Sequence, residues 1–363
     1  MKRISPAIAL AACFALTLSG CGSDDPTGAK GVGGSGQQKN VLQGIGSSAQ
    51  KSAMDAWIAG FEKKQSTTSV QYSPDGSGAG VKQFLAGAAK FAGSDKYLDD
   101  DQAAKANSVC GPDGAYEFPV YISPIAVAFN LPGIKHLNFA PSTIAEIFSG
   151  KISAWDDPAI KADNPNAKLP STKITAVHRS DDSGTTNNFT DYLHQTAPKA
   201  WPDEAAETFP HKGEAASGTT GVVQTVQGAE GAIGYIDASA VGKDLGTAKI
   251  KVGSNFTAMT SEGAATVVGE SKQTAGRGKH DLAIDLNRTT TTKGAYPLVL
   301  VSYHLVCSSY KDEKTVDAVK AWEKYVVSSA AQQAAEENAG SAAIPQSVSD
   351  KAVRAIDSIT VKK

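Results

Sequence analysis

Short apolar runs alternate with amphipathic helical patterns along this chain, and small polar residues stand between them. The runs 41–45 and 70–72 are typical of buried strands. Each is followed by a turn rich in Gly and Ser, and then by a segment whose apolar residues recur with helical spacing. The same order returns at 90–95 and at 174–192. This alternation predicts an α/β fold in which polar turns gather beyond the carboxyl ends of the strands.

One of these turns carries more chemistry than the others: Arg179-Ser180-Asp181-Asp182-Ser183-Gly184-Thr185. A guanidinium, hydroxyl groups and the free backbone N–H groups of a helix start would surround one point. The partial positive charge of the helix N-terminus favours an anion there, and the planar fork of arginine suits two oxygens of one oxyanion. A Ser-Gly-Thr run at a helix start is also an ordinary N-cap, and an Arg beside an Asp can be a plain surface pair. The turn alone does not decide between these interpretations.

The N-terminus is typical of a secreted lipoprotein. Lys2 and Arg3 precede an apolar run from Ala7 to Leu18, which is too short to span a bilayer. The run ends in Leu18-Ser19-Gly20-Cys21, which resembles a bacterial lipobox, in which the cysteine receives the lipid. We therefore expect a signal peptide at 1–20, lipidation at Cys21 and a flexible Gly- and Ser-rich tether at 21–39. The alternative is an ordinary signal peptide with an incidental cysteine.

The chain has four cysteines, and their positions separate their roles. Cys13 leaves with the signal peptide and Cys21 would carry the lipid. Cys110 and Cys307 remain, and in an oxidising compartment we expect them to form a disulfide. Two buried free thiols or a metal site are the alternatives, although the cysteines and histidines show no metal-ligand spacing.

Composition narrows the class of ligand. The formal net charge is −2, aromatic residues make up 7% of the chain, and there is no basic run, which argues against a nucleic-acid partner. A mildly acidic protein that binds an anion must do so by local geometry rather than by its overall field. No sequence pattern indicates a cofactor, and none is expected.

At this point the chain resembles a known family, the phosphate-binding lipoproteins of the phosphate-specific (Pst) ABC transporters. The resemblance covers nearly everything after Val41. Its most specific segments, besides the turn at 179–185, are Gly80-Val81-Lys82-Gln83, Phe91-Ala92-Gly93-Ser94-Asp95, Ile147-Phe148-Ser149-Gly150-Lys151-Ile152, Trp155-Asp156-Asp157-Pro158-Ala159-Ile160 and Gly231-Ala232-Ile233-Gly234-Tyr235.

The resemblance implies a set of phosphate-binding residues: Ser48, Ala49 through its backbone N–H, Ser77, Asp95, Arg179, Ser183, and the N–H groups of Gly184 and Thr185. Asp181 would hold the arginine rather than touch the anion. The chain departs from the family at its first turn, where Gly-Ala-Gly-Ala-Thr-Phe-Pro is common. Here the run at 44–50 is Gly-Ile-Gly-Ser-Ser-Ala-Gln, which keeps a hydroxyl at Ser48 but loses the Phe and the Pro.

Asp95 gives the sharpest chemical expectation. Phosphate still carries a proton at neutral pH, so a carboxylate can accept a hydrogen bond from it. Sulfate carries no proton and would meet Asp95 as a like charge, at a cost of several kcal/mol. A helix N-cap is the alternative role for Asp95.

The family resemblance also implies a two-lobed binding-protein fold of α/β class, with two hinge strands and the ligand in the cleft between the lobes. The apolar runs 120–130 and 298–306 are the natural crossings, so we expect one lobe at 40–127 and 300–363 and the other at 128–299. We expect residues 255–295, polar and rich in Thr and Gly, to be irregular structure of the second lobe.

The function implied is that of an extracytoplasmic, lipid-anchored and monomeric receptor, not an enzyme, that passes inorganic phosphate to the permease subunits of an ABC transporter. The alternatives are a receptor for another tetrahedral oxyanion (sulfate, molybdate or a phosphonate), a phosphate sensor or adhesin without a transporter, or a secreted phosphate-ester hydrolase. None of the turn serines lies in a G-x-S-x-G elbow, which argues against the hydrolase.

Overall fold

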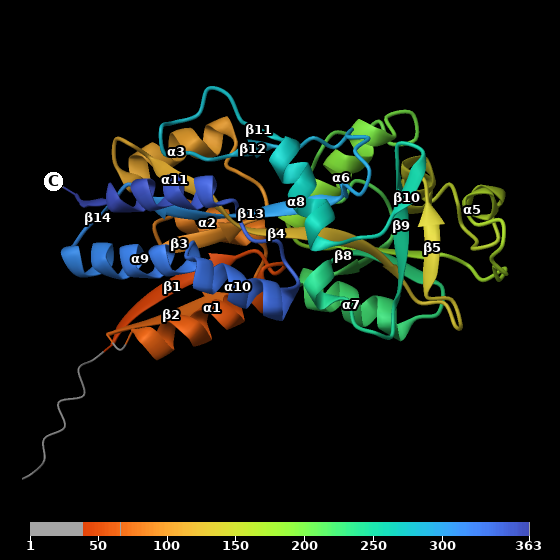
Figure 1. Ribbon diagram of the computed structural model, residues 1–363, viewed down its shortest axis with the longest axis horizontal. Coiled ribbons are helices and arrows are strands. Elements are labelled where there is room, and N and C mark those ends of the chain that lie inside the picture. Colours follow the sequence, from red (N-terminus) through yellow and green to blue (C-terminus); the bar gives the residue numbers. More distant parts are fainter. Residues whose placement is uncertain (1–38, 66, 363) are drawn as a thin grey trace, which may run out of the picture. The chain divides into compact units, whose positions relative to one another are not determined.

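The structure is a computed structural model that describes residues 39–65 and 67–362. The predicted signal peptide, Cys21 and nearly all of the tether lie outside the described residues. The described part has the α/β architecture that the sequence predicts (Figure 1). None of its helices is long and apolar enough to cross a membrane.

The first strands form a parallel sheet, and each is followed by a helix. Strand β1 pairs in parallel with both β2 and β3, and their carboxyl ends therefore point to the same edge. The polar turns that follow the strands meet at this edge. The elements are β1 (Asn40–Gly46), α1 (Lys51–Lys64), β2 (Thr68–Ser73), α2 (Ser77–Leu85), β3 (Phe91–Ser94) and α3 (Asp100–Cys110).

Two long strands, β4 (Ala115–Phe129) and β13 (Val299–Cys307), continue this sheet. They pair antiparallel along most of their length, and β13 also pairs with β3. Nearly every residue of both strands is buried, which explains their continuous apolar sequence. In Figure 1 they run from the β1–β3 region into the rest of the molecule, as expected of crossing strands.

The far end of β4 belongs to a second region of sheet. There β4 pairs with β8 and β9, and the strand order continues from β8 to β6 and β7. The strands are β5 (His136–Phe139), β6 (Thr175–Arg179), β7 (Glu214–Ala216), β8 (Ala232–Asp237), β9 (Gly246–Val252) and β10 (Asn255–Thr257). The helices are α4 (Pro141–Phe148), α5 (Pro158–Asp163), α6 (Gly184–Thr196), α7 (Gly218–Gly228) and α8 (Ser261–Glu270). Strands β8, β6 and β7 run parallel, so α6 and α7 both begin at the same edge.

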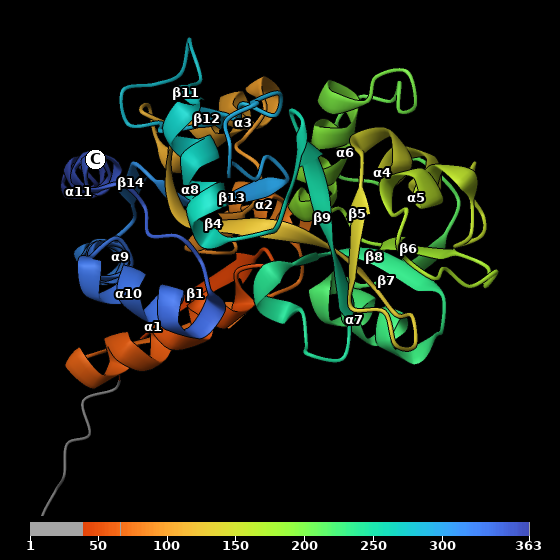
Figure 2. The ribbon, with the colours of Figure 1, turned by 45° about the vertical axis from the view of Figure 1, so that its right-hand side comes forward.

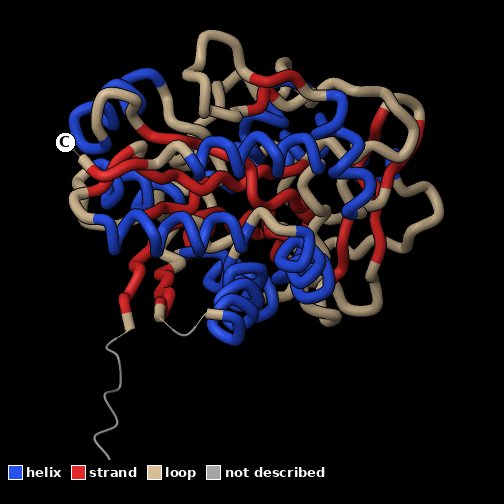
Figure 3. Tube along the Cα trace, turned by 60° about the vertical axis from the view of Figure 1, so that its left-hand side comes forward, coloured by secondary structure: helices blue, strands red, loops and turns tan. Residues whose placement is uncertain are grey.

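The C-terminal part of the chain returns to the β1–β3 region. Helices α9 (Glu313–Val326) and α10 (Ser329–Ala339) lie beside α1, and α11 (Gln346–Asp357) packs against α9 and β4 (Figure 2). The Trp57 indole N–H donates to the Ala331 carbonyl of α10. The short strands β14 (Ser309–Tyr310) and β15 (Thr360–Val361) pair in parallel. Figure 3 shows the same arrangement, with helices outside the strands. The predicted lobe boundaries remain a prediction.

The expectation of irregular structure at 255–295 was wrong for part of this segment. It contains β10, α8, β11 (Lys272–Gln273) and β12 (Ile284–Asp285). Part of it also lies against the start of β4 and the segment after β3, because Arg277 pairs with the buried Glu117 of β4 at 2.6 Å and donates to the Leu98 carbonyl at 2.8 Å. Arg277 also pairs with Asp281 at 2.7 Å. Burial, reinforced by the Asp281 charge, raises the pKa of Glu117 to about 8 despite the arginine. Sequence patterns do not reveal such a long-range ion pair.

The disulfide expectation is confirmed. Cys110, the last residue of α3, is bonded to Cys307, the last residue of β13. Cys110 is fully buried and Cys307 nearly so. The bond joins positions that are 197 residues apart, and it therefore ties the C-terminal return of the chain to the β1–β3 region.

The carboxyl group of Asp237, at the end of β8, leads to a prediction on stability. It accepts from the Tyr121 hydroxyl and from the Ser239 N–H, each at 3.0 Å, while Oδ2 has no partner among the described residues. Burial raises the pKa of Asp237 to about 6. In the unfolded chain the Asp237 carboxyl ionises at a lower pKa, near 3.9. The free energy of unfolding therefore falls as pH rises from about 4 to about 6, and it stays lower above pH 6.

The substitution Asp237→Asn is therefore expected to stabilise the fold by about 2–3 kcal/mol above pH 6 and by little near pH 4. Urea unfolding at pH 4 and at pH 7.5 measures the difference. A gain of the same size at both pH values would contradict this explanation.

Candidate functional site

Four helices begin close to one another at the edge where the polar turns meet. Between the starts of α2 and α6, the Gly78 N–H donates to the Asp182 carbonyl at 3.1 Å. Between the turn before α1 and the start of α7, the Thr219 N–H donates to Ser48 Oγ at 3.0 Å. Because helix N-termini carry partial positive charge and free N–H groups, their convergence favours a small anion.

Arg179 lies at the centre of this convergence. It ends strand β6 and is 4% exposed. Its Nε donates to Asp181 Oδ1 at 2.8 Å, and its Nη2 donates to Asp181 Oδ2. The carboxylate also accepts from the Gly218 N–H at 2.9 Å. Burial alone would raise the pKa of Asp181, but the Arg179 hydrogen bond and charge outweigh burial and lower it. Asp181 thus holds one side of the guanidinium fork, which leaves Nη1 available to a ligand.

Glycines at two helix starts permit these close approaches. Gly76, at the N-cap of α2, has φ of 103°, and a Cβ there would lie 2.5 Å from Asp181 Oδ2. A Cβ on Gly184 would lie 2.7 Å from Ser77 Oγ and 2.8 Å from Asp95 Cβ. Any side chain at either position would push the turns after β2 and β3 away from the turn after β6.

Asp95 follows β3 and is 3% exposed. Its Oδ1 accepts from Ser302 Oγ at 2.6 Å, and its Oδ2 accepts from Thr185 Oγ1 at 3.1 Å. Burial raises the pKa of Asp95, and these hydroxyl groups and Arg179 oppose that rise. An ionised Asp95 here is acceptor-only, so a further partner must bring its own proton.

The hydroxyl and N–H donors predicted from the sequence lie close to Arg179 and Asp95. Ser77 Oγ accepts from the Asp95 N–H at 3.1 Å, and Ser183 Oγ accepts from the Thr186 N–H at 3.2 Å as the N-cap of α6. Each hydroxyl proton therefore remains to be donated. Within the described chain, no acceptor contacts the N–H groups of Gly184 and Thr185.

The first turn differs from its prediction in detail. Ser48 Oγ lies 3.0 Å from Thr219 Oγ1 and accepts from the Thr219 N–H, so its hydroxyl is already in contact with α7. The Ala49 N–H donates to Ser47 Oγ at 3.1 Å rather than standing free. A ligand at this turn would share these donors with the protein.

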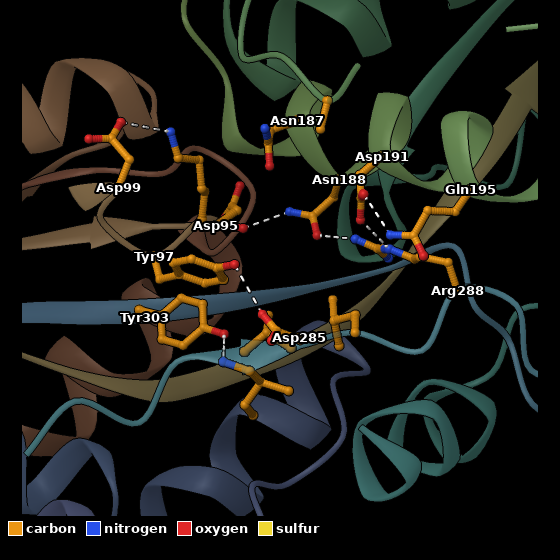
Figure 4. Close-up of a pocket in the computed structure, with 15 residues that line it drawn as sticks. Asp95, Tyr97, Asp99, Asn187, Asn188, Asp191, Gln195, Asp285, Arg288 and Tyr303 are labelled. Atoms are coloured by element: carbon orange, nitrogen blue, oxygen red, sulfur yellow. Dashed lines mark hydrogen bonds and ion pairs between the residues drawn. The ribbon is translucent and has the colours of Figure 1, made fainter. Parts of the chain in front are cut away.

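A pocket of about 520 Å³ lies beside Asp95, on the side of α6 and β13 (Figure 4). Asn188 spans its edge: its side-chain N–H donates to the Asp95 carbonyl at 2.6 Å, and its Oδ1 accepts from Arg288 Nη2 at 2.6 Å. Arg288 is 2% exposed and also donates to the Val299 carbonyl of β13. Lys96, which also lines the pocket, pairs with Glu207 at 3.2 Å. The Asn188 hydrogen bond joins the turn after β3 directly to α6.

The charged residues of the site do not add up to a positive charge. Arg179 is offset by Asp181, and Asp95 adds a buried carboxylate, so the attraction for an anion comes from helix starts and hydroxyl groups as well as from the guanidinium. The described site offers hydrogen-bond donors together with one acceptor. It suits a small oxyanion that still carries a proton.

Sequence reasoning missed several residues of the site. The start of α7, Gly218 and Thr219, follows the small polar residue Ser217 and precedes an apolar helical pattern, but no apolar run precedes it, because β7 has only three residues. Ser302 interrupts an apolar strand and Asn188 lies inside a helix. Nothing in their local sequence indicates that they contact Asp95.

Comparison with known proteins identifies the family. Residues 33–330 match the model of the PBP superfamily domain. The chain is 35% identical to phosphate-binding protein PstS2 of Mycobacterium bovis over 99% of both chains. Among solved structures, a phosphate-binding protein of Stenotrophomonas maltophilia has a TM-score of 0.66 at 19% identity, covering 87% of this chain and 93% of its own.

A putative phosphate ABC transporter substrate-binding protein of Clostridium perfringens, solved with bound phosphate, has a TM-score of 0.60 at 19% identity. The match covers 83% of this chain and 98% of that one. At such identity the two structures speak for the fold alone, which is two-lobed. The near-full-length match to PstS2 decides the family. The chain belongs to the PstS family of phosphate-binding proteins within the PBP superfamily.

Proposed function

We propose that this protein is an extracytoplasmic receptor that captures inorganic phosphate between its lobes and delivers it to the permease of an ABC transporter. The observation that carries the proposal is the buried meeting point of the α1, α2, α6 and α7 starts, with Arg179 and Asp95 inside it. The membership of the chain in the PstS family supports phosphate as the ligand.

The ligand-binding set that we propose is the one expected from the sequence: Ser48, Ala49, Ser77, Asp95, Arg179, Ser183, Gly184 and Thr185. In this proposal Arg179 Nη1 donates to one phosphate oxygen, the helix-start N–H groups and hydroxyls donate to the others, and Asp95 accepts from the phosphate proton. Asp181 keeps the guanidinium oriented. Binding and release are the whole of the proposed chemistry, and no covalent step is required.

The proposal includes the cellular setting. Lipid at Cys21 would hold the protein at the membrane as a monomer, with 21–39 as a tether long enough for the receptor to reach the permease subunits. A two-lobed receptor that closes on its ligand presents a different surface when loaded, and a permease can distinguish loaded from empty receptor by that difference.

Calorimetric titration of the soluble chain from residue 22 tests phosphate binding. We expect one phosphate per protein at neutral pH and moderate salt, and no heat with sulfate. Equal binding of both anions would point instead to a receptor for another tetrahedral oxyanion. Absence of binding to either would contradict the proposed function.

A further inference from the structure

The side chain of Gln50 turns into the core instead of toward solvent. Gln50 stands at the N-cap of α1, directly after Ser48 and Ala49, but its side chain makes no capping hydrogen bond within the described chain. Its Oε1 lies 3.2 Å from His304 Nε2. On the other side of the ring, His304 Nδ1 lies 2.7 Å from Glu323 Oε2. A chain of three polar side chains therefore runs from the first turn through β13 to α9.

This polar chain is costly to bury. Gln50, His304 and Glu323 are all 0% exposed, and aromatic rings surround the imidazole, with Phe91 centred 5.2 Å and Trp322 6.5 Å away. Gln50 Nε2 and Glu323 Oε1 have no hydrogen-bond partner among the described residues, which adds to the cost. Apolar side chains of the same volume would pack here without that cost. Stability alone therefore does not account for these three residues.

Gln50, at one end of this polar chain, contacts two of the segments that build the anion site. A Cβ added to Gly93 would lie 2.6 Å from Gln50 Nε2, so the amide lies directly over Gly93 of β3. The Gly93 carbonyl accepts from the Ser47 N–H at 2.8 Å, and Asp95 follows two residues later. Gln50 is thus wedged between the turn that carries Ser48 and the strand that leads to Asp95.

The buried side chain of Gln50 can restrain the backbone of the first turn. A proline at such a turn would fix its own backbone angle near −65° through its ring. Gln50 has φ of −81° but no ring to hold it there. Anchoring the side chain in the core can restrain the same turn.

We propose that Gln50, His304 and Glu323 are positioning residues for the anion site. They hold the first turn in the geometry in which Ser48 meets the ligand, although none of the three touches it. The proposal rests on the proposed function, phosphate binding in this cleft. His304 is the central link because both of its ring nitrogens are engaged, one toward the turn and one toward α9.

Three variants separate this role from simple packing. Gln50→Met keeps the length of the side chain but removes the link to the ring. His304→Gln places an amide nitrogen near the position of Nε2 and keeps the link to Gln50, whereas His304→Asn places one near Nδ1 and keeps only the link to Glu323. Phosphate affinity by calorimetry and thermal unfolding without phosphate are measured for each.

We expect Gln50→Met and His304→Asn to weaken phosphate binding by about tenfold, and His304→Gln to bind within about threefold of the unaltered protein. The matched control is Gln332→Met. Gln332 of α10 is another buried glutamine, and it donates to the Val120 and Val326 carbonyls. Its loss is expected to lower the unfolding temperature while leaving phosphate affinity unchanged.

The outcomes distinguish failure of this positioning role from failure of the proposed function. Phosphate binding by the unaltered protein together with unchanged affinity in Gln50→Met would overturn this proposal alone. Affinity that falls in step with unfolding temperature in all four variants, the control included, would also overturn it, because packing would then suffice. Failure of the unaltered protein to bind phosphate would overturn the proposed function, and this proposal with it. If Gln50→Met does not fold, the two histidine variants decide.

Discussion

Replacement of Arg179 by alanine is expected to weaken phosphate binding by roughly a thousandfold, or about 4 kcal/mol. Two effects add. The anion loses a charged donor, and Asp181, now without the guanidinium that it binds through Nε and Nη2, is left as a carboxylate facing the ligand. The Gly218 N–H alone does not offset that charge. Calorimetric titration measures the loss, with thermal unfolding to verify that the variant is folded.

Arg179→Lys refines the same test. Lysine keeps the charge but cannot donate to both Asp181 oxygens and to a ligand from one rigid plane, so we expect a loss of roughly tenfold to a hundredfold. The control is Arg354→Ala on α11, which removes a cation that forms no ion pair in the described chain. Equal losses for Arg179→Ala and Arg354→Ala would show that total charge, and not this site, governs binding.

The substitution Asp95→Asn is expected to reduce the preference for phosphate over sulfate by about a hundredfold or more. The ionised carboxylate accepts from a proton that phosphate has and sulfate lacks. An amide at this position removes the repulsion of sulfate and offers it a donor. Phosphate affinity falls at the same time, because the acceptor for its proton becomes weaker and the single amide oxygen can accept from Ser302 or from Thr185 but no longer gives each its own oxygen.

Competition titrations of both anions at neutral pH measure this preference. Asp75→Asn is the matched control. Asp75 is an exposed carboxylate that lines the same surface pocket as Ser48. It removes one negative charge without touching the proposed ligand position. If Asp95→Asn keeps the selectivity of the unaltered protein, Asp95 does not recognise the phosphate proton.

Part of the fold could be predicted from the sequence because its two long strands, β4 and β13, are buried on both faces. Continuous apolar runs such as those of β4 and β13 have no other explanation in a chain of this kind. The turns after β1, β2 and β6 could be predicted for a related reason, since a helix start needs small polar residues. The same reasoning overlooked the α7 start at 217–219, because the strand before it, β7, has only three residues and gives no apolar run.

What could not be predicted depends on contacts between distant residues. The segment 272–285 is held to the start of β4 by Arg277 and Glu117, which are 160 positions apart. Ser302 and Asp95 meet across 207 positions, and Gln50 and His304 across 254. A buried polar residue has the same sequence signal whether it satisfies a neighbour or orients a ligand-binding group, so only the fold reveals its partner.

The central claim is the position of the anion, and a crystal structure of the soluble protein with phosphate at neutral pH tests it most directly. The account predicts one phosphate within hydrogen-bond distance of Arg179 Nη1, Ser77 Oγ and the Gly184 and Thr185 N–H groups, with an Asp95 carboxylate oxygen against a phosphate oxygen. A phosphate found instead in the pocket lined by Lys96, Asp191 and Arg288, with Arg179 and Asp95 unengaged, would contradict it.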